Sequence, residues 1–181
     1  MHSIMWRGPA GNLDRCTLNQ TTGGWRLAGT SLLVIDDASY EIRYSVVLDD
    51  AWGTRTVGAH VQGPGADRRM ALSSDGTGTW SVTDEPVLEL FGATDADLAW
   101  TPATTIVPIR RLDLAVGESG SVVAARIAFP QHEIERVTQY YERLSESTYR
   151  HSFGELTTEI AVDESGLVTR YGNLWTAVAV G

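Results

Sequence analysis

The 181-residue sequence predicts a mostly β protein with a meandering antiparallel sheet and a single domain. Apolar residues alternate with polar ones along most of the chain, which is the period of a half-buried strand. Turn-forming residues interrupt these runs at intervals of about 8 to 12 residues, as in sheets whose strands are joined by hairpins. A hydrophobic content of 43% and a charged content of 20% are typical of a globular protein with a substantial core. We therefore expect one domain over residues 1–181.

The clearest strand pattern covers residues 40–48. Its apolar side chains share one face, which consists of Tyr40, Ile42, Tyr44, Val46 and Leu48. Residues 55–62 place three aliphatic side chains on one face, namely Val57, Ala59 and Val61, and Arg55 extends that face at its start. The same alternation recurs over residues 123–129 and 156–162. Each of these segments predicts a strand with one buried face.

Two short turns predict hairpins. Asp75-Gly76 separates two short strand-like runs, and Ser165-Gly166 follows the run that ends at residue 162. Glycine adopts the positive φ that tight turns require, so each pair favours a reversal of the chain. Since both halves of the chain then contain a strand, an acidic turn with glycine and a second strand, an internal duplication is one interpretation.

Residues 132–147 fit two periods. A strand would align Val137, Gln139 and Tyr141, whereas a helix would align Ile134, Val137, Tyr141 and Leu144. The segment is rich in β-branched and aromatic residues, which favours a strand. We therefore predict a strand here, although the periodicity alone allows a helix.

The stretch TPATTIVPIRRLDL, residues 101–114, has two adjacent arginines at the start of an alternating run. If this run is a strand, Arg110 lies on the same face as two leucines, where a charge is costly unless it is paired or lies beside a polar ligand. Asp95 and Asp97 are the candidate partners, because a guanidinium binds a carboxylate through two parallel hydrogen bonds. We expect Arg110 either to pair with one of these aspartates or to anchor an anion or a polar head group in a cavity.

The charge of the chain excludes several classes of partner. A net charge of -9 and a pI near 4.8 argue against nucleic-acid binding and against general adsorption to anionic membranes. All fourteen basic residues are arginine, so Schiff-base and phosphate-loop lysine chemistry are excluded. No window approaches the length of an apolar transmembrane helix, and the N-terminal residues do not resemble a signal peptide. We therefore expect no transmembrane segment and a cytoplasmic protein.

Catalytic and metal-binding motifs are absent from the sequence. Cys16 is a single cysteine, so neither a disulfide within the chain nor a cysteine-rich metal site is possible. The four histidines show no paired metal-ligand spacing: His2, His60, His132 and His151. The glycine pairs fit turns and not a phosphate-binding loop. We expect no metal and no cofactor.

Many of these residues also form a family pattern. The stretch with Thr101, Pro102, Thr104, Pro108, Ile109, Arg110, Arg111 and Leu112 resembles the signature of the putative glycolipid-binding family of bacterial proteins. Further matches are Trp6, Arg7, Gly29, Tyr44, Asp49, Trp52, Thr54, Arg55, Asp75, Gly76, Trp80, Asp95, Asp97, Leu98 and residues 162–171. The resemblance covers essentially the whole chain. Ala103, Thr105 and Val107 depart from it, since the family has an aromatic residue, an asparagine and a leucine at these positions.

The resemblance implies a fold and a function. The fold of the family is similar to a strongly curved antiparallel sheet, a β-roll or half-barrel, that partly encloses an apolar cavity. The function it implies is non-enzymatic binding of a lipid, a glycolipid or a similar amphiphile. On the residues and the resemblance together, we predict that the ligand-binding residues are Trp52, Arg55, Trp80, Asp95, Asp97, Arg110 and Arg111. Any one of the six tryptophans can equally fill the core of a β protein.

Two other functions are compatible with the sequence. Asp95 and Asp97 resemble the carboxylate pair of a glycoside hydrolase, although neighbouring arginines would keep both ionised and leave no general acid. An interaction module with an exposed sheet edge would need no cavity. A cavity lined by tryptophan and tyrosine would favour the binding of an amphiphile, and a fully packed interior would favour the interaction module.

Overall fold

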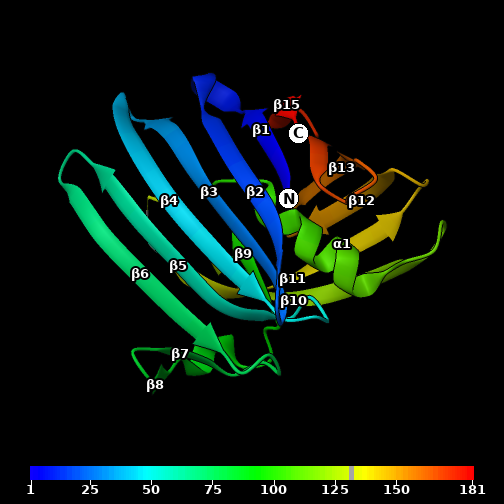
Figure 1. The fold of residues 1–181 in the computed structure, drawn as a ribbon, viewed down its shortest axis with the longest axis horizontal. Helices are drawn as coiled ribbons and strands as arrows, with labels where there is room; N and C mark the ends of the chain where they lie inside the picture. Colours follow the sequence, from blue (N-terminus) through cyan, green and yellow to red (C-terminus); the bar gives the residue numbers. More distant parts are fainter. Residues whose placement is uncertain (131–132) are drawn as a thin grey trace.

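A computed structural model describes residues 1–130 and 133–181 of the chain. In these residues fifteen strands form one curved open sheet (Figure 1). The strands of the first half are β1 (His2–Arg7), β2 (Leu13–Thr21), β3 (Gly24–Ile35), β4 (Ala38–Leu48), β5 (Thr54–Gly63), β6 (Ala66–Ser74), β7 (Trp80–Val82) and β8 (Glu85–Pro86). Those of the second half are β9 (Asp95–Leu98), β10 (Ser119–Ile127), β11 (Ile134–Arg143), β12 (Thr148–Phe153), β13 (Leu156–Val162), β14 (Val168–Tyr171) and β15 (Trp175–Val180).

The two halves meet in the middle of the sheet. β1 pairs with β15, β8 lies at one edge and β9 at the other, and the chain steps from neighbour to neighbour on each side. Among the described strands every pair is antiparallel except β9 and β10, which run parallel. β9 begins the second half after a crossover from β8, and this crossover brings the aspartates of β9 beside β10. The predicted curved antiparallel sheet is confirmed, and it is open at both edges.

Few helices accompany the sheet in the described residues. They are α1 (Ile106–Leu112) and three 3-10 turns: η1 (Pro9–Gly11), η2 (Leu88–Leu90) and η3 (Ala103–Thr105). α1 packs through Ile109 against Val122 of β10, Tyr141 of β11 and Ile160 of β13. The helix therefore covers part of the face of the second half of the sheet, and a larger core fills the space beside it.

The strand predictions are confirmed. In β4 the side chains of Ile42, Tyr44, Val46 and Leu48 are buried, and in β5 those of Val57, Ala59 and Val61 are buried. Arg55, which was expected to extend this second face, is exposed. Most of residues 132–147 form β11, as the β-branched and aromatic content predicted. The turn at Asp75-Gly76 joins β6 to β7, and the turn at Ser165-Gly166 joins β13 to β14. A common origin of the two halves stays a prediction.

The run of residues 108–114 does not form a strand, which corrects the sequence prediction. η3 is followed directly by α1, which ends at Leu112, and the C-cap residue Asp113 has a φ of 45°. Pro108 lies in the first turn of α1, where a proline removes no helical hydrogen bond. A helix of seven residues spans only two turns, so its apolar residues fit the helical and the strand period equally well. Successive side chains of a helix point about 100° apart and not to opposite faces, so the two arginines diverge.

Candidate functional site

The largest concentration of polar side chains in the interior lines a cavity of about 370 Å³ between β9, the η3–α1 segment and strands β10 to β12. Asp95 and Asp97 of β9 line it, together with Gln139 and Tyr141 of β11 and His151 of β12, which come from nearby strands of the same sheet. Thr101, Pro102, Thr104 and Pro108 of the TP..T..PIRRL stretch line it as well. The stretch that carries the family signature is therefore a wall of this cavity.

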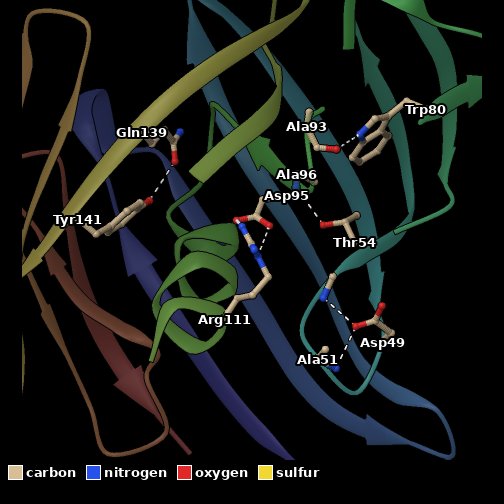
Figure 2. A network of polar contacts seen from close by, with 11 residues as sticks. Asp49, Ala51, Thr54, Trp80, Ala93, Asp95, Ala96, Arg111, Gln139 and Tyr141 are labelled. Carbon is tan, nitrogen blue, oxygen red and sulfur yellow. Dashed lines mark hydrogen bonds and ion pairs between the residues drawn. The ribbon is translucent and has the colours of Figure 1, made fainter. Parts of the chain in front are cut away.

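Asp95 is held by Arg111. Nε of Arg111 donates to Oδ1 of Asp95 at 2.7 Å, and an Nη donates to Oδ2 at 3.1 Å, so the pair is bidentate (Figure 2). The Asp95 side chain is 1% exposed and that of Arg111 is 27% exposed. Burial raises the pKa of Asp95, and the guanidinium opposes that rise. The arginine therefore compensates a carboxylate that has almost no access to water.

Asp97 has a separate set of partners. Its Oδ2 accepts hydrogen bonds from Nη of Arg126 at 3.0 Å and from the Gln139 amide at 2.8 Å. The Gln139 carbonyl accepts in turn from the Tyr141 hydroxyl at 3.0 Å. Burial also raises the pKa of Asp97, with Arg126 opposing. Both bonds end on Oδ2, so within the described part of the chain Oδ1 of Asp97 keeps its acceptor capacity.

His151 is the least satisfied polar group of the cavity. Its ring stacks on Tyr141 with centroids 4.6 Å apart, and its Nδ1 lies 2.7 Å from the Tyr171 hydroxyl. Nε2 is buried and has no hydrogen-bond partner among the residues that the structure describes. Burial lowers the pKa of His151 to about 4, so the ring is neutral at physiological pH. A neutral imidazole can donate or accept at Nε2, depending on its tautomer.

A buried carboxyl, Asp14, lies behind the threonine wall. The Tyr44 hydroxyl donates to Oδ1 of Asp14 at 2.8 Å, the Ser31 hydroxyl donates to Oδ2, and Thr101 lies 3.5 Å from the Tyr44 hydroxyl. These partners are neutral, and no ion pair to Asp14 forms in the described residues. Burial therefore raises the pKa of Asp14 to about 6. Thr101 connects this group to the cavity, because it also lines the cavity.

Gly29→Ala is expected to lower the free energy of unfolding by about 1 to 3 kcal/mol. A Cβ atom at Gly29 would lie 2.3 Å from the Tyr44 hydroxyl oxygen, so the phenol would have to leave Asp14. Urea titration measures the loss. Gly58→Ala in β5, on the far side of β4, is the control, since a Cβ there meets no atom within 4 Å. Equal stabilities of the two variants would contradict this account of Gly29.

The mouth of the cavity carries apolar side chains beside Glu155. It is formed by two hairpin turns, one carrying Phe153 and Leu156 and the other carrying Leu174. Leu156 is 38% exposed and Leu174 is 45% exposed. Arg126 lies over the Phe153 ring at 5.0 Å, which places the ring between the mouth and the Asp97 cluster. The interior is thus more polar than the apolar cavity that the fold class led us to expect.

The predicted pairing of Arg110 with an aspartate is wrong. Arg110 is exposed, and its guanidinium donates to the Ser165 carbonyl at 2.9 Å. It also lies 5.9 Å from the ring centroid of Trp52, which stacks on Trp25. Arg110 and Trp52 therefore share a surface pocket of about 210 Å³, apart from the cavity beside β9. The pairing fails because α1 turns Arg110 away from β9 and directs the next residue, Arg111, toward it.

Arg55 and Trp80 do not line the cavity beside β9. Arg55 pairs with Asp49 at 3.2 Å and donates to the Asp75 carbonyl, so it ties the β4–β5 loop to the β6–β7 turn. Trp80 is fully buried, and its indole donates to the Ala93 carbonyl at 2.7 Å (Figure 2). Of the predicted ligand-binding residues, Asp95 and Asp97 line the cavity and Arg111 supports it from behind.

Sequence reasoning missed several polar residues of the cavity: Arg126, Gln139, Tyr141, His151 and Tyr171. Gln139 could have been predicted. In a strand it falls between Val137 and Tyr141 on one face, and a buried amide on that face needs polar partners. Nothing in the sequence identified His151 as a site residue, because a histidine in an alternating run fits an exposed face as well as a buried one. His132, which was considered with it, lies outside the described residues.

The described residues contain no group of three metal-ligating side chains, and no helix among them is long and apolar enough to cross a membrane. Burial raises the pKa of the Cys16 thiol to about 12, so this cysteine is unreactive. The described site therefore consists of hydrogen-bonding groups and apolar surface.

Comparison with known proteins gives one family and one similar structure. A family model described as "Putative glycolipid-binding" matches residues 3–177. A crystal structure of a DUF1089 family protein from Pseudomonas aeruginosa superimposes with a TM-score of 0.84 at 29% sequence identity, over 94% of each chain. No curated protein matches the chain. Because the family model covers almost the entire sequence, the chain belongs to the putative glycolipid-binding family.

Proposed function

We propose that the protein binds an amphiphile, such as a lipid or a glycolipid, in the cavity beside β9 without transforming it. The observation that carries this proposal is the composition of the cavity, where buried polar groups lie behind exposed leucines at the mouth. An amphiphile needs both kinds of surface, and a cavity of about 370 Å³ lies within the usual range of about 300 to 1,000 Å³ for ligand pockets. Tyr141, Tyr171 and Trp175 line it, which favours a ligand site over a packed interaction module.

The ion pairs of the two aspartates support binding over hydrolysis. A glycoside hydrolase needs one protonated carboxyl as general acid and a second, free carboxylate. Arg111 occupies both oxygens of Asp95, and Arg126 and Gln139 share one oxygen of Asp97. In this arrangement both carboxylates act as hydrogen-bond acceptors. Both position the walls of the cavity, and Oδ1 of Asp97 offers lone pairs to a ligand.

Native mass spectrometry of the purified protein tests the proposal. We expect an amphiphile at near-stoichiometric amounts, either as purified or after incubation with a total lipid extract, and solvent extraction would identify it. Ala99→Phe places a ring at the cavity wall and should abolish the adduct, whereas Ala115→Phe, at an exposed position outside the cavity, should retain it. A protein that stays free of adducts under both conditions, or an adduct insensitive to Ala99→Phe, would overturn the proposal.

A further inference from the structure

We infer that the amphiphile binds with its polar head inward and its apolar tail at the mouth, and that the head is uncharged and rich in hydroxyl groups. This inference rests on the proposed function and adds the orientation and the chemical class of the ligand. It follows from the distribution of polar groups along the depth of the cavity, from their charges and from their unused hydrogen-bonding capacity.

The deep end and the mouth of the cavity differ in the side chains that line them. Five polar lining residues are almost inaccessible, since Asp95 is 1% exposed and Thr104, Gln139, Tyr141 and His151 are 2% to 4% exposed. The side chains of Asp97 and Arg126 are 21% and 25% exposed. The apolar residues of the two hairpin turns, Leu156 and Leu174, are instead 38% and 45% exposed. Buried polar groups without partners are costly, so the deep end gains most from a polar ligand group. Exposed leucines at the mouth gain from contact with an alkyl chain.

The charges around the deep end disfavour an anionic head. Asp95 and Asp97 face the cavity, and each is matched by one guanidinium, that of Arg111 or that of Arg126. Glu155 adds a third carboxylate at the mouth. No guanidinium of the described lining is left over to neutralise a phosphate or a sulfate, and buried like charges repel strongly.

The unused hydrogen-bonding groups fit hydroxyls. Nε2 of His151 lacks a partner, and Oδ1 of Asp97 retains its acceptor capacity within the described residues. A carboxylate oxygen only accepts, whereas the neutral imidazole donates or accepts according to the tautomer that the Tyr171 hydroxyl selects. A hydroxyl group satisfies either requirement because it both donates and accepts. Several hydroxyls on a compact head, as in a sugar, would therefore satisfy both positions at once.

The size of the cavity agrees with this orientation. A volume of about 370 Å³ lies near the lower end of the range for ligand pockets. It accommodates a compact head and the first part of a chain, and it does not enclose long acyl chains as well. The remaining chain would lie across Leu156 and Leu174 toward solvent or toward a membrane.

Four small probes test the inference on the intact protein. They are octyl glucoside, which has a hydroxyl-rich head, octyl sulfate, which has the same tail on an anionic head, octanol, which has the tail alone, and methyl glucoside, which has the head alone. The two surfactants, octyl glucoside and octyl sulfate, are titrated below their critical micelle concentrations. The binding of each of the four probes is followed by calorimetry and by the chemical shifts of backbone NMR resonances. We expect octyl glucoside to bind at least tenfold more tightly than octyl sulfate or octanol. Methyl glucoside should bind more weakly and shift the resonances of β11 and β12.

Two variants locate the two ends of the ligand. His151→Phe keeps a ring against Tyr141 but removes Nε2, together with the Nδ1 that contacts the Tyr171 hydroxyl. It should weaken both glucosides by about tenfold, since the hydrogen bond of the ligand to Nε2 is lost. Leu156→Ser should weaken octyl glucoside at least threefold and methyl glucoside less. Val116→Ser, a substitution of an exposed apolar residue in a turn away from the cavity, is the control and should change neither. Circular dichroism and a urea titration confirm that each variant is folded.

The outcomes separate this inference from the proposed function. If none of the amphiphiles binds and no lipid co-purifies, the proposed function itself fails. If octyl sulfate binds as tightly as octyl glucoside, or if His151→Phe is folded and leaves both glucosides unaffected, amphiphile binding stands and the inward orientation of a hydroxyl-rich head is overturned.

Discussion

Arg111→Ala is expected to lower the free energy of unfolding by about 3 to 5 kcal/mol, because it leaves the buried Asp95 carboxylate without its cation. Arg110→Ala, one position earlier, is expected to lower it by less than about 1 kcal/mol, because Arg110 is exposed and contacts backbone carbonyls. Chemical denaturation with urea at neutral pH measures both. The two substitutions remove the same side chain from adjacent positions of one short helix, so they serve as controls for each other.

The Arg111 effect should depend on pH and on Asp95. Without the guanidinium, burial alone acts on the Asp95 carboxyl and raises its pKa further. Below that pKa the carboxyl is neutral and costs less to bury, so the loss caused by Arg111→Ala should shrink as the pH falls. The double substitution Arg111→Ala with Asp95→Asn should recover most of the loss. Equal losses for Arg110→Ala and Arg111→Ala would refute the assignment of the ion pair to Arg111.

The Asp14→Asn variant is expected to show a pH dependence of the free energy of unfolding that is nearly absent from the native protein. The pKa of Asp14 is about 6 in the folded protein against an ordinary value of 3.8, which corresponds to about 3 kcal/mol. Between these values the folded protein holds a proton that the unfolded chain has lost. The contribution of Asp14 to the free energy of unfolding is therefore highest near pH 4 and falls as the pH rises through 6.

His151 acts in the same pH range with the opposite sign. Its pKa is about 4 in the folded protein against an ordinary value of 6.5, so between these values the unfolded chain holds the extra proton. Stability from His151 is therefore fully present above pH 6.5 and is lost as the pH falls toward 4, by about 3 kcal/mol. In the native protein these two contributions nearly cancel.

Urea titrations at pH 4, 5, 6 and 7 test this compensation. Relative to the native protein, Asp14→Asn should gain about 3 kcal/mol between pH 4 and pH 7, and His151→Phe should lose about as much over the same range. Other titrating groups, such as Asp95 and Asp97, cancel in these differences because they are common to all three proteins. Curves that run parallel for Asp14→Asn and the native protein would show that Asp14 is not buried as described.

The family signature has a structural explanation in this site. Thr104 accepts a hydrogen bond from the backbone of Leu98, and Thr101 accepts one from the backbone of Ala103, so the two threonines fix η3 against the end of β9. Arg111 then reaches Asp95 from the last turn of α1. The signature thus positions one wall of the cavity, and β11 and β12 add Gln139, Tyr141 and His151.

The fold was predictable because its signals are local. The alternation in β4 and β5 assigns each side chain to a face without reference to the rest of the chain, and Asp75-Gly76 needs only its own backbone to reverse direction. For the same reason β11 was correctly assigned by its β-branched and aromatic residues. The short α1 was not, because two turns are too few to distinguish a helical from a strand period.

The site was predictable only in part. From the sequence by itself, an arginine of the adjacent pair was expected to meet Asp95 or Asp97, since a buried charge requires a partner. Only the tertiary structure decided which arginine pairs, because the helical turn of α1 directs Arg111 and not Arg110 toward β9. It also decided that Gln139 meets Asp97, 42 residues away, and that His151 meets Tyr171. Alternation and turns depend on neighbours in the chain, whereas these contacts depend on how a curved sheet brings distant strands together.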